Sequence, residues 1–583
     1  MNDYGELETG QLVWYEFHER ASVLIVEKDE EIHRPLICNM TLDVTFVKYQ
    51  DYLKCNKKPY ALNRAVYDYI VLMDVLGKCE DAEFFLQKVY LDLKEDGILL
   101  LIANNKYGIR FFCGDYDGYT GMPYNGINDY PVDRFGKNYD KRGLTELLVH
   151  SGFKYMKFYY PLPDFRLLQV VYTDEIPPKE DFMERVIFCF EHTEALFADE
   201  RCLYADIIRN GVFPFFSNSF IVEASAEKVK FCDISYAAVS IDRAPEHAFI
   251  TAIHEKKKVT KRPIYEDRAD VIHVLEQNTK ALSKKGIPVL EAKYENKKIV
   301  MDYVTHPTLA NHLRNLSGQR DKDGILEIFE RLYQYILASS EETDAKDNVL
   351  SEQYEISDWG IILKKAFLEL IPMNCFFIDG DFLFFDQEFV YDNFPALFVL
   401  FRGLRYSYRC ISNLNGIISR QDICKHFGIS DALWQTFEKE EQKLQIYVKQ
   451  RKRHKTFYQN IFLDREEIYK RALLEDCTVR EKAFNFDAVK KEQCVIFGAG
   501  KIAGIFIEKY GKAYRSLRLF DNEPSLWGNF KWGVKVENPK ILQDVPPQDA
   551  EVVVCANNRN YIMIARQIET LGITDYFHYI PEK

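Results

Sequence analysis

Several features that define large classes of protein are missing from this 583-residue chain. It has no excess of basic residues, and its net charge of -13 argues against a general nucleic-acid binder. No run approaches the ~18 uninterrupted apolar residues of a membrane-spanning helix. The first residues, MNDYGELETGQLVWYEF, are acidic and carry no apolar signal core. We therefore expect a cytoplasmic protein and leave open peripheral contact with the inner face of a membrane.

Clustered metal ligands are missing as well. The 13 cysteines are scattered and form no C-x-x-C pair, which argues against a structural zinc site. An odd number of cysteines without a secretory signal is typical of reduced thiols in a cytoplasm. What the chain does have is apolar sequence, 47% of all residues, and a length that predicts three or four domains.

The hydrophobic pattern predicts a multidomain α/β protein with four segments. Residues 1–225 alternate apolar strands with helices, which predicts a mainly parallel sheet covered on both faces, followed by an antiparallel pair. Residues 230–410 open with short strands and continue with helices. Residues 411–487 are helical and charged, and residues 488–583 form a compact α/β unit.

A predicted hairpin has chemically functional polar side chains at both of its ends. It lies in residues 369–389, ELIPMNCFFIDGDFLFFDQEF. Two apolar runs flank an Asp-Gly pair, which favours a tight turn. Asn374 precedes the first run, Asp386 follows the second, and Glu369 lies five residues before the asparagine. Amide and carboxylate oxygens suit magnesium, and phosphoryl transfer needs metal ligands, a lysine on the phosphates and a carboxylate at the acceptor hydroxyl.

This order of residues resembles protein kinases and aminoglycoside-type phosphotransferases, and the upstream strands resemble the first strands of their N-terminal lobe. The resemblance implies a bilobal kinase-like α+β fold with ATP and magnesium as cofactors. It also implies roles for five residues: Glu369 as the catalytic carboxylate, Asn374 and Asp386 as metal ligands, and Lys261 (or Lys258) on the phosphates with Glu276 as its ion-pair partner.

The chain departs from that family in three ways. The catalytic position holds glutamate, which is one methylene longer than the usual aspartate. The segment SIDRAPEHAF has no glycine where a glycine-rich loop would cover the phosphates. The A-P-E signature is missing, so a protein substrate is not expected.

Residues 67–108, YDYIVLMDVLGKCEDAEFFLQKVYLDLKEDGILLLIANNKYG, resemble the second half of class I S-adenosylmethionine-dependent methyltransferases. The resemblance implies a Rossmann-like methyltransferase fold, S-adenosylmethionine as cofactor, and a cleft lined by Asp74, Asn104, Asn105, Asp115 and Asp117. The alternative is that these are turn and cap residues. No glycine occurs between Gly10 and Gly77, although a glycine turn normally lets the backbone approach the cofactor.

The stretch CVIFGAGKIAG predicts a small Rossmann-like domain at the C-terminal end. An apolar strand leads into Gly498, Gly500, Ala503 and Gly504, and Asp521 ends the next strand about twenty residues later. This pattern predicts binding of NAD or a nucleotide sugar. It also resembles small domains appended to sugar-modifying enzymes, so a structural role remains the alternative.

The basic run VKQRKRHK, residues 448–455, follows a predicted helix that carries Trp434, Phe437 and Leu444, with Phe457 nearby. A basic face opposite an aromatic face is typical of a helix at a membrane surface. The alternatives are a solvated face, or pairing of the 430–465 helix with another domain or a second copy.

The order of these parts resembles the methyltransferase–kinase that terminates O-antigen chains. The resemblance implies a bacterial protein of surface-polysaccharide biosynthesis that transfers phosphate from ATP to a hydroxyl of a glycan or lipid-linked glycan. One alternative is a methyltransferase acting on a sugar. Another is a pseudoenzyme scaffold that binds nucleotide sugars or a glycosyltransferase partner.

Overall fold

The computed structural model describes residues 12–27, 43–54, 66–131, 136–179, 186–190, 192–265, 271–449, 464–472, 482–486, 491–543 and 550–581. The chain divides into two compact units, Met1–Arg465 and Glu466–Lys583. The four boundaries predicted from the sequence stay predictions. Among the described residues, no helix is long and apolar enough to cross a membrane.

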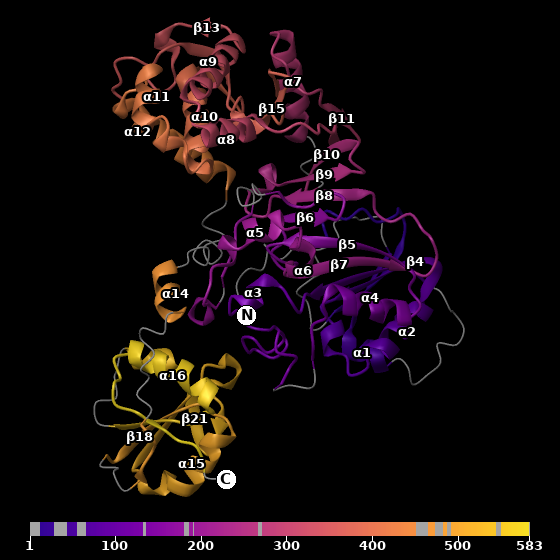
Figure 1. The fold of residues 1–583 in the computed structure, drawn as a ribbon, viewed down its shortest axis with the longest axis vertical. Helices are drawn as coiled ribbons and strands as arrows, with labels where there is room; N and C mark the ends of the chain where they lie inside the picture. Colours follow the sequence, from indigo (N-terminus) through magenta and orange to yellow (C-terminus); the bar gives the residue numbers. More distant parts are fainter. Residues whose placement is uncertain are drawn as a thin grey trace. The chain divides into compact units, whose positions relative to one another are not determined.

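The first unit is built on a 12-stranded mixed sheet (Figure 1). Its strand order is β11-β12-β10-β9-β8-β6-β5-β7-β4-β3-β1-β2. The N-terminal seven strands are β1 (Ser22–Glu27), β2 (Asp43–Lys48), β3 (Tyr67–Met73), β4 (Leu93–Asn104), β5 (Tyr155–Leu162), β6 (Val170–Thr173) and β7 (Ser219–Ser225). The helices of this part are α1 (Tyr49–Lys54), α2 (Ala82–Asp92), α3 (Ile109–Phe112), α4 (Lys141–His150), α5 (Tyr204–Arg209) and α6 (Phe213–Phe216).

Strand directions define the fold of the N-terminal part. Strands β2, β1, β3 and β4 are parallel, whereas β7 runs antiparallel to both β4 and β5. The central strands β1, β3, β4 and β7 are apolar and buried because both faces of the sheet are covered. Residues 12–17 pack on one face, and α2 and α4 contact each other. This order, with a reversed strand inserted near the end, is the class I methyltransferase-like arrangement expected from the sequence.

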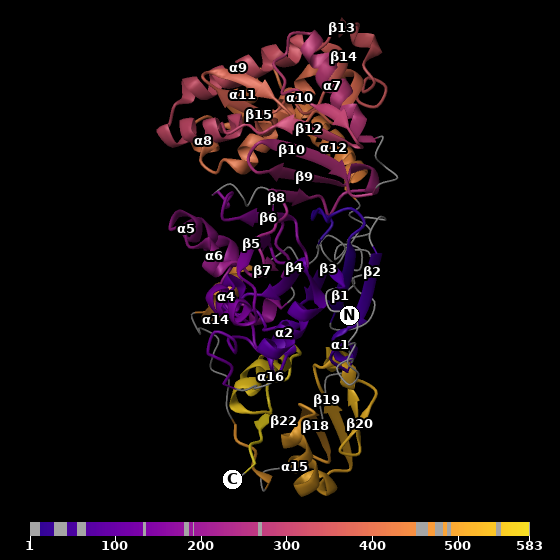
Figure 2. The same ribbon diagram turned by 90° about the vertical axis from the view of Figure 1, so that its right-hand side faces the viewer.

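The sheet does not end at the N-terminal part. Strand β8 (Ile234–Val239) pairs with β6 through Val170–Ala238 and Val171–Ala237. It continues antiparallel into β9 (Phe249–His254), β10 (Lys258–Pro263) and β12 (Lys298–Asp302), which Figure 2 shows in this order. Strand β11 (Lys293–Glu295) pairs antiparallel with β12. Helix α7 (His273–Lys284) packs on these strands. Two segments that the sequence predicts as separate therefore share one sheet.

The remainder of the first unit is mainly helical around its own apolar core. It contains α8 (Leu309–Gln319), α9 (Lys322–Ala338), α10 (Ala396–Cys410), α11 (Arg420–His426), α12 (Asp431–Val448) and the short sheet β13 (Glu342–Thr343), β14 (Ile362–Phe367) and β17 (Val390–Pro395). The boundary between the two units falls at the start of α14 (Arg465–Ala472). The predicted hairpin is confirmed as β15 (Cys375–Ile378) and β16 (Asp381–Phe384). Asp379 and Gly380 both have positive φ, at 51° and 93°, as a tight two-residue turn requires.

Helix α12 uses its aromatic face inside the unit. Trp434, Phe437 and Leu444 are buried in the same core as α10. These three side chains are therefore not exposed to a membrane or a second copy, which corrects the interpretation of this helix as a surface helix with a free aromatic face. Residues 450–455 of the basic run and Phe457 lie outside the described residues.

The second unit contains a six-stranded sheet in the order β20-β21-β19-β18-β22-β23. Its strands are β18 (Gln493–Phe497), β19 (Ser516–Phe520), β20 (Phe530–Lys531), β21 (Val534–Glu537), β22 (Ala550–Val554) and β23 (Phe577–His578). All pairs are parallel except β20–β21. Helices α15 (Lys501–Tyr510) and α16 (Asn558–Thr570) pack into two different cores formed by alternate residues of β18, and so cover opposite faces.

Candidate functional sites

Lys261 lies at the centre of a largely buried cluster of charged and polar side chains. We call it the Lys261 centre, and its members are Arg243, Lys261, Glu369, Asn374, Asp386, Glu388 and Arg402. Lys261 is on β10 and is 4% exposed. Its Nζ donates to Oδ1 of Asp386 at 2.5 Å and to Glu388, across 125 and 127 residues of chain. Burial alone would lower the pKa of Lys261, but Asp386 and Glu388 outweigh burial and raise it. The lysine is therefore held charged inside the protein.

Two acids reach Lys261 because the chain turns sharply after β16. Asp386 has φ of 58°, a left-handed conformation that a non-glycine residue rarely adopts. Gln387 secures the turn by donating to the carbonyls of Glu369 and Phe385 at 3.0 and 2.9 Å. Backbone strain of this kind persists when surrounding contacts enforce it, and it clusters at functional sites.

Glu388 is the innermost acid of the centre. Arg243 Nη1 donates to its Oε2 at 3.1 Å, so Glu388 lies between Arg243 and Lys261. Burial would raise the pKa of Glu388, but the two cations outweigh burial and lower it. Sequence reasoning missed Glu388, although it lies two residues after Asp386 in the DQE stretch.

Glu369 and Asn374 form a second contact in the centre. Asn374 Nδ2 donates to Glu369 Oε2 at 3.1 Å, and Arg402 Nη1 donates to Oε1 at 3.3 Å. Burial raises the pKa of Glu369 to about 7, assisted by Glu388 and Asp386 and opposed by Arg402. A carboxyl group with a pKa near neutrality is suited to general base catalysis.

The predicted ion pair between Lys261 and Glu276 is corrected by the structure. Glu276 pairs with Lys280 at 3.0 Å and with His273 at 3.1 Å, on its own helix α7. The acid beside Lys261 is Glu388 instead. Lys258, the alternative phosphate lysine, is exposed and pairs with Asp302 at 2.6 Å. The structure thus brings Lys261, Glu369, Asn374 and Asp386 together, leaves Glu276 and Lys258 outside, and adds Arg243, Glu388 and Arg402.

The metal-ligand hypothesis can be tested against the free oxygens of the Lys261 centre. Within the described part of the chain, nothing donates to Oδ1 of Asn374 or to Oδ2 of Asp386, and Asp386 is 30% exposed. Two oxygen ligands with space for water and phosphate oxygens suit magnesium. The phosphates would have fewer backbone contacts than in a kinase, because residues 240–248 between β8 and β9 contain no glycine and so form no glycine-rich loop.

A second group of polar residues lies at the carboxyl ends of β3, β4 and β5. Asp74 follows β3 with φ of 51°, and its Oδ1 accepts from Tyr119 Oη at 2.7 Å and from Asn104 Nδ2 at 3.4 Å. Asn104 Oδ1 accepts from Arg110 Nη2 at 2.7 Å, and Arg110 Nη1 donates to Asp164. A continuous polar network therefore crosses the edge where α/β folds bind their ligands.

Of the other predicted cleft residues, two stabilise loops and turns and one lines a cavity. Asn105 donates to the carbonyls of Phe215 and Ser217, both at 2.7 Å, and so holds a loop. Asp117 accepts from the Tyr119 amide at 2.9 Å and from Asn138 Nδ2 at 2.7 Å, which is the turn-stabilising role. Asp115 instead lines a cavity.

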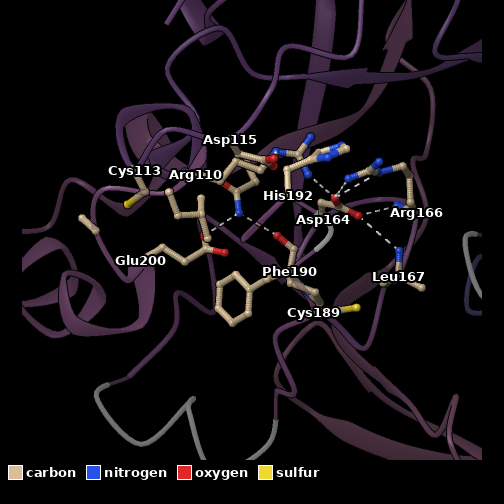
Figure 3. Close-up of a pocket in the computed structure, with 14 residues that line it drawn as sticks. Arg110, Cys113, Asp115, Asp164, Arg166, Leu167, Cys189, Phe190, His192 and Glu200 are labelled. Carbon is tan, nitrogen blue, oxygen red and sulfur yellow. Dashed lines mark hydrogen bonds and ion pairs between the residues drawn. The ribbon is translucent and has the colours of Figure 1, made fainter. Parts of the chain in front are cut away.

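The cavity has a volume of about 30 Å³ and opens beside this network (Figure 3). Among the described residues, its acidic and basic lining side chains are Arg110, Asp115, Asp164, Arg166, His192 and Glu200. Apart from Asp115, sequence reasoning missed them. They come from segments far apart in the chain, and the one available signal was Asp164 in the stretch PLPDF.

The site where a class I methyltransferase fold would bind S-adenosylmethionine is altered in this chain. Strand β1 ends at Glu27, which is buried, and residues 28–42 lie outside the described residues. Tyr119 packs so tightly on Gly77 that a Cβ at that glycine would lie 2.3 Å from the ring. Tyr119 therefore fills the space beside Asp74, and the residues present match S-adenosylmethionine less well than the strand order does.

In the second unit the glycine turn interacts with its own acid. Gly498 has φ of 92°, and a Cβ there would lie 2.8 Å from the Cys555 carbonyl. Oδ2 of Asp521 accepts from the Ala499 amide at 2.6 Å. Trp532 packs on Gly504 and donates to the Ala499 carbonyl at 3.2 Å. Gly500 precedes α15 and Ala503 is buried within it. Dinucleotide or nucleotide-sugar binding stays a prediction for this turn.

Comparison with known proteins yields fold neighbours only. No protein-family model matches the chain, and no curated protein matches it. A SAM-dependent methyltransferase from Thermotoga maritima is 14% identical, with 39% of this chain and 89% of that chain covered and a TM-score of 0.21. A phosphoethanolamine N-methyltransferase from Haemonchus contortus is 13% identical, with coverages of 37% and 51% and a TM-score of 0.21. A Rex-family repressor is 17% identical, with coverages of 31% and 79% and a TM-score of 0.14.

These scores are low, so the class of the N-terminal part is defined by its strand order. That part has a class I methyltransferase-like fold within a multidomain α/β protein that contains large sheets.

Proposed function

We propose that the Lys261 centre binds a magnesium nucleotide and transfers a phosphoryl group to a hydroxyl of a glycan or glycolipid. The observation that supports this proposal is the contact of Lys261 Nζ with Asp386 Oδ1 at 2.5 Å, close to the Glu369–Asn374 pair at 3.1 Å. The resemblance to kinases and aminoglycoside-type phosphotransferases assigns these four residues to phosphoryl transfer. They come from separate elements, and a hairpin without a site would not require them to meet.

Each residue has a distinct role in this proposal. Lys261 would contact phosphate oxygens, and Asn374 and Asp386 would hold the metal through their free oxygens. The metal would neutralise charge on the transferred group. Glu369 would accept the proton of the acceptor hydroxyl, for which its pKa of about 7 is suited.

Glu388 argues for weak nucleotide binding. It already neutralises Lys261, so the phosphates must compete with a carboxylate that is bound to the same Nζ. If Glu388 binds Lys261 more tightly than the phosphates do, the centre does not bind the nucleotide and the protein is a pseudoenzyme. This is the scaffold alternative for this part of the chain.

Transfer of radiolabelled phosphate from ATP to glycan acceptors by the full chain tests the proposal. We expect Asp386→Asn and Lys261→Met to reduce transfer by about 100-fold or more, because each removes charge stabilisation from the transition state. Lys258→Met, three residues away on the same strand, is the matched control and should leave transfer unchanged. Equal activity of Asp386→Asn and wild type would refute the assignment.

A second candidate function is S-adenosylmethionine-dependent methyl transfer by the N-terminal part. It is favoured by the class I strand order and by the network from Asp74 to Arg110 at the ligand-binding edge. Isothermal calorimetry of the full chain with S-adenosylmethionine and S-adenosylhomocysteine tests it. No detectable heat at millimolar concentrations would rule out this function.

The biological setting remains a proposal as well. A lipid-linked glycan acceptor, a glycosyltransferase partner, peripheral contact with the inner membrane face, and NAD or nucleotide-sugar binding by the second unit all depend on the resemblance to surface-polysaccharide proteins. A thermal-shift panel with ATP–magnesium, NAD and nucleotide sugars would separate the ligand proposals, because ligands that bind the native state raise the melting temperature.

A further inference from the structure

The cavity beside the methyltransferase-like edge contains a buried carboxyl group that is only partly satisfied by its neighbours (Figure 3). Glu200 lies in the short helix η7 (Glu200–Cys202), lines the cavity and is only 6% exposed. Its Oε2 accepts from Asn218 Nδ2 at 3.0 Å and from Tyr204 Oη at 3.3 Å. Within the described residues, no hydrogen bond reaches Oε1. One oxygen of a buried carboxyl group therefore faces the cavity unpaired.

The two guanidinium groups of the cavity are bound to a different acid. Arg110 Nη1 and Arg166 Nη2 both donate to Oδ2 of Asp164, the latter at 2.9 Å. Asp164 is consequently compensated twice, and its pKa is lowered although burial opposes this. The hydrogen bonds that Glu200 accepts come instead from the neutral side chains of Asn218 and Tyr204.

Among the described lining residues, the charges that face Glu200 do not balance. The lining contains the carboxylates of Asp115 and Asp164 besides Glu200 itself, and the guanidinium groups of Arg110 and Arg166. His192 and the thiols of Cys113 and Cys189 complete the titratable lining, and Tyr204 contacts Glu200 from α5. Three acids thus face two permanent cations, and a buried carboxylate without a counter-ion is strongly unfavourable.

We propose that Glu200 is the recognition carboxylate of a binding site for a primary ammonium head group. An ammonium group would supply the missing positive charge and donate to Oε1. The volume of about 30 Å³ holds roughly two water-sized groups, which is the size of methylammonium. Phe190, Leu167 and Leu196 form the apolar wall that the attached carbon would contact. The proposal is independent of both phosphotransfer and methyl transfer.

The site makes binding dependent on pH in a defined direction. Burial raises the pKa of Glu200 to about 7, assisted by Asp115 and Asp164 and opposed by Asn218 and Arg110. Below that pH the group is protonated and neutral, so it attracts a cation weakly. Affinity should therefore rise about tenfold between pH 6 and pH 8, as the carboxylate fraction rises from about a tenth to about nine-tenths.

The test is a titration of the full chain with methylammonium chloride, monitored by saturation-transfer NMR at pH 6 and pH 8. Sodium acetate at the same ionic strength is the comparison ligand. We expect methylammonium to bind, to bind about tenfold more tightly at pH 8, and to show no competition with acetate. Preferential binding of acetate, or a flat or falling affinity across this pH range, would overturn the proposal.

Two variants complete the design. Glu200→Gln keeps the shape of the side chain and should abolish both the binding and its pH dependence. Asp206→Asn removes an exposed carboxylate on α5 outside the cavity lining and should change neither. Unaltered binding by Glu200→Gln would refute the site, and if that variant fails to fold, the pH dependence and acetate comparison of the wild type decide the question.

Discussion

Glu369 and Glu388 lie in one buried centre, yet their surroundings shift their pKa values in opposite directions. Glu388 lies between two cations, whereas Glu369 is buried with the negative charges of Glu388 and Asp386 nearby. Pairs of carboxyl groups whose environments separate their pKa values are typical of sites in which one acts as a base and the other remains an ion.

Glu388→Gln should be strongly destabilising. It removes the carboxylate that compensates Lys261 and Arg243, and breaking a buried ion pair in this way costs about 3–5 kcal/mol. Glu276→Gln, at the residue that the sequence predicts as the partner of Lys261, removes only ion pairs within its own helix and should cost about 1 kcal/mol or less. Urea unfolding of both variants measures the difference, and a larger loss for Glu276→Gln would contradict the observed pairing.

Glu369 should make stability fall as pH rises towards neutrality. Its folded pKa is raised from 4.5 to about 7, so the native state binds more protons than the unfolded state in this window. The contribution of Glu369 to the free energy of unfolding is present below pH 4.5 and is lost between pH 4.5 and 7. Glu369→Gln should flatten this decline in urea unfolding profiles. Glu200→Gln is the necessary comparison, because Glu200 titrates in the same window, and identical profiles for wild type and Glu369→Gln would contradict the prediction.

At the scale of single elements, the β15–β16 hairpin positions the metal-ligand candidates. Its turn requires Gly380 at φ of 93°, and Arg331 Nη2 donates to the Gly380 carbonyl at 2.8 Å. Gly380→Ala places a Cβ in the left-handed region and should cost about 1–2 kcal/mol in chemical unfolding.

The control for the hairpin is Gly318→Ala in α8. A Cβ added at Gly318 would have no neighbour within 4 Å, and the residue lies in a helix, so alanine should stabilise the protein by about 0.5–1 kcal/mol. Destabilisation by both variants to the same extent would show that the turn geometry is not the cause.

The same hairpin shows how far the sequence could predict the site. An Asp-Gly pair between apolar runs favours a tight turn by itself, so the hairpin and the positions of Asn374 and Asp386 at its ends were predictable. The parallel strands β1, β3 and β4 were predictable for a similar reason, since their apolar runs are local. Local patterns decide local structure.

The partners of buried charges were not predictable in this way. Lys261 pairs with Glu388 and not with Glu276 because the choice depends on where α7 lies relative to β10, which no local pattern records. Likewise, Arg110, Asp164 and Glu200 meet at one cavity although they lie on separate segments. The spacing of Glu369, Asn374 and Asp386 does follow a recognisable pattern, but no spacing reveals Glu388 as the partner of Lys261 or brings the three cavity residues together.

At the scale of the whole first unit, pairing between β6 and β8 joins the methyltransferase-like part to the strands from β8 onward, which the sequence predicts as a separate segment. Strand β6 would be an unpaired edge if the chain ended before β8, and exposed edges promote association between chains. A fragment of residues 1–230 should therefore aggregate in size-exclusion chromatography, while residues 1–465 should remain monodisperse. A monomeric fragment with an unchanged melting temperature would show that this strand pairing is dispensable.

The tryptophans of the chain give the second unit an optical reporter. Of the five, Trp14, Trp359 and Trp434 are buried, whereas Trp527 and Trp532 of the second unit are 36% and 49% exposed. Trp532 covers the glycine turn. Its indole donates to the carbonyl of Ala499, inside the segment that a dinucleotide would approach. We expect a ligand that enters this turn to displace the indole of Trp532 and so to change the red-edge emission of the protein without any added fluorophore.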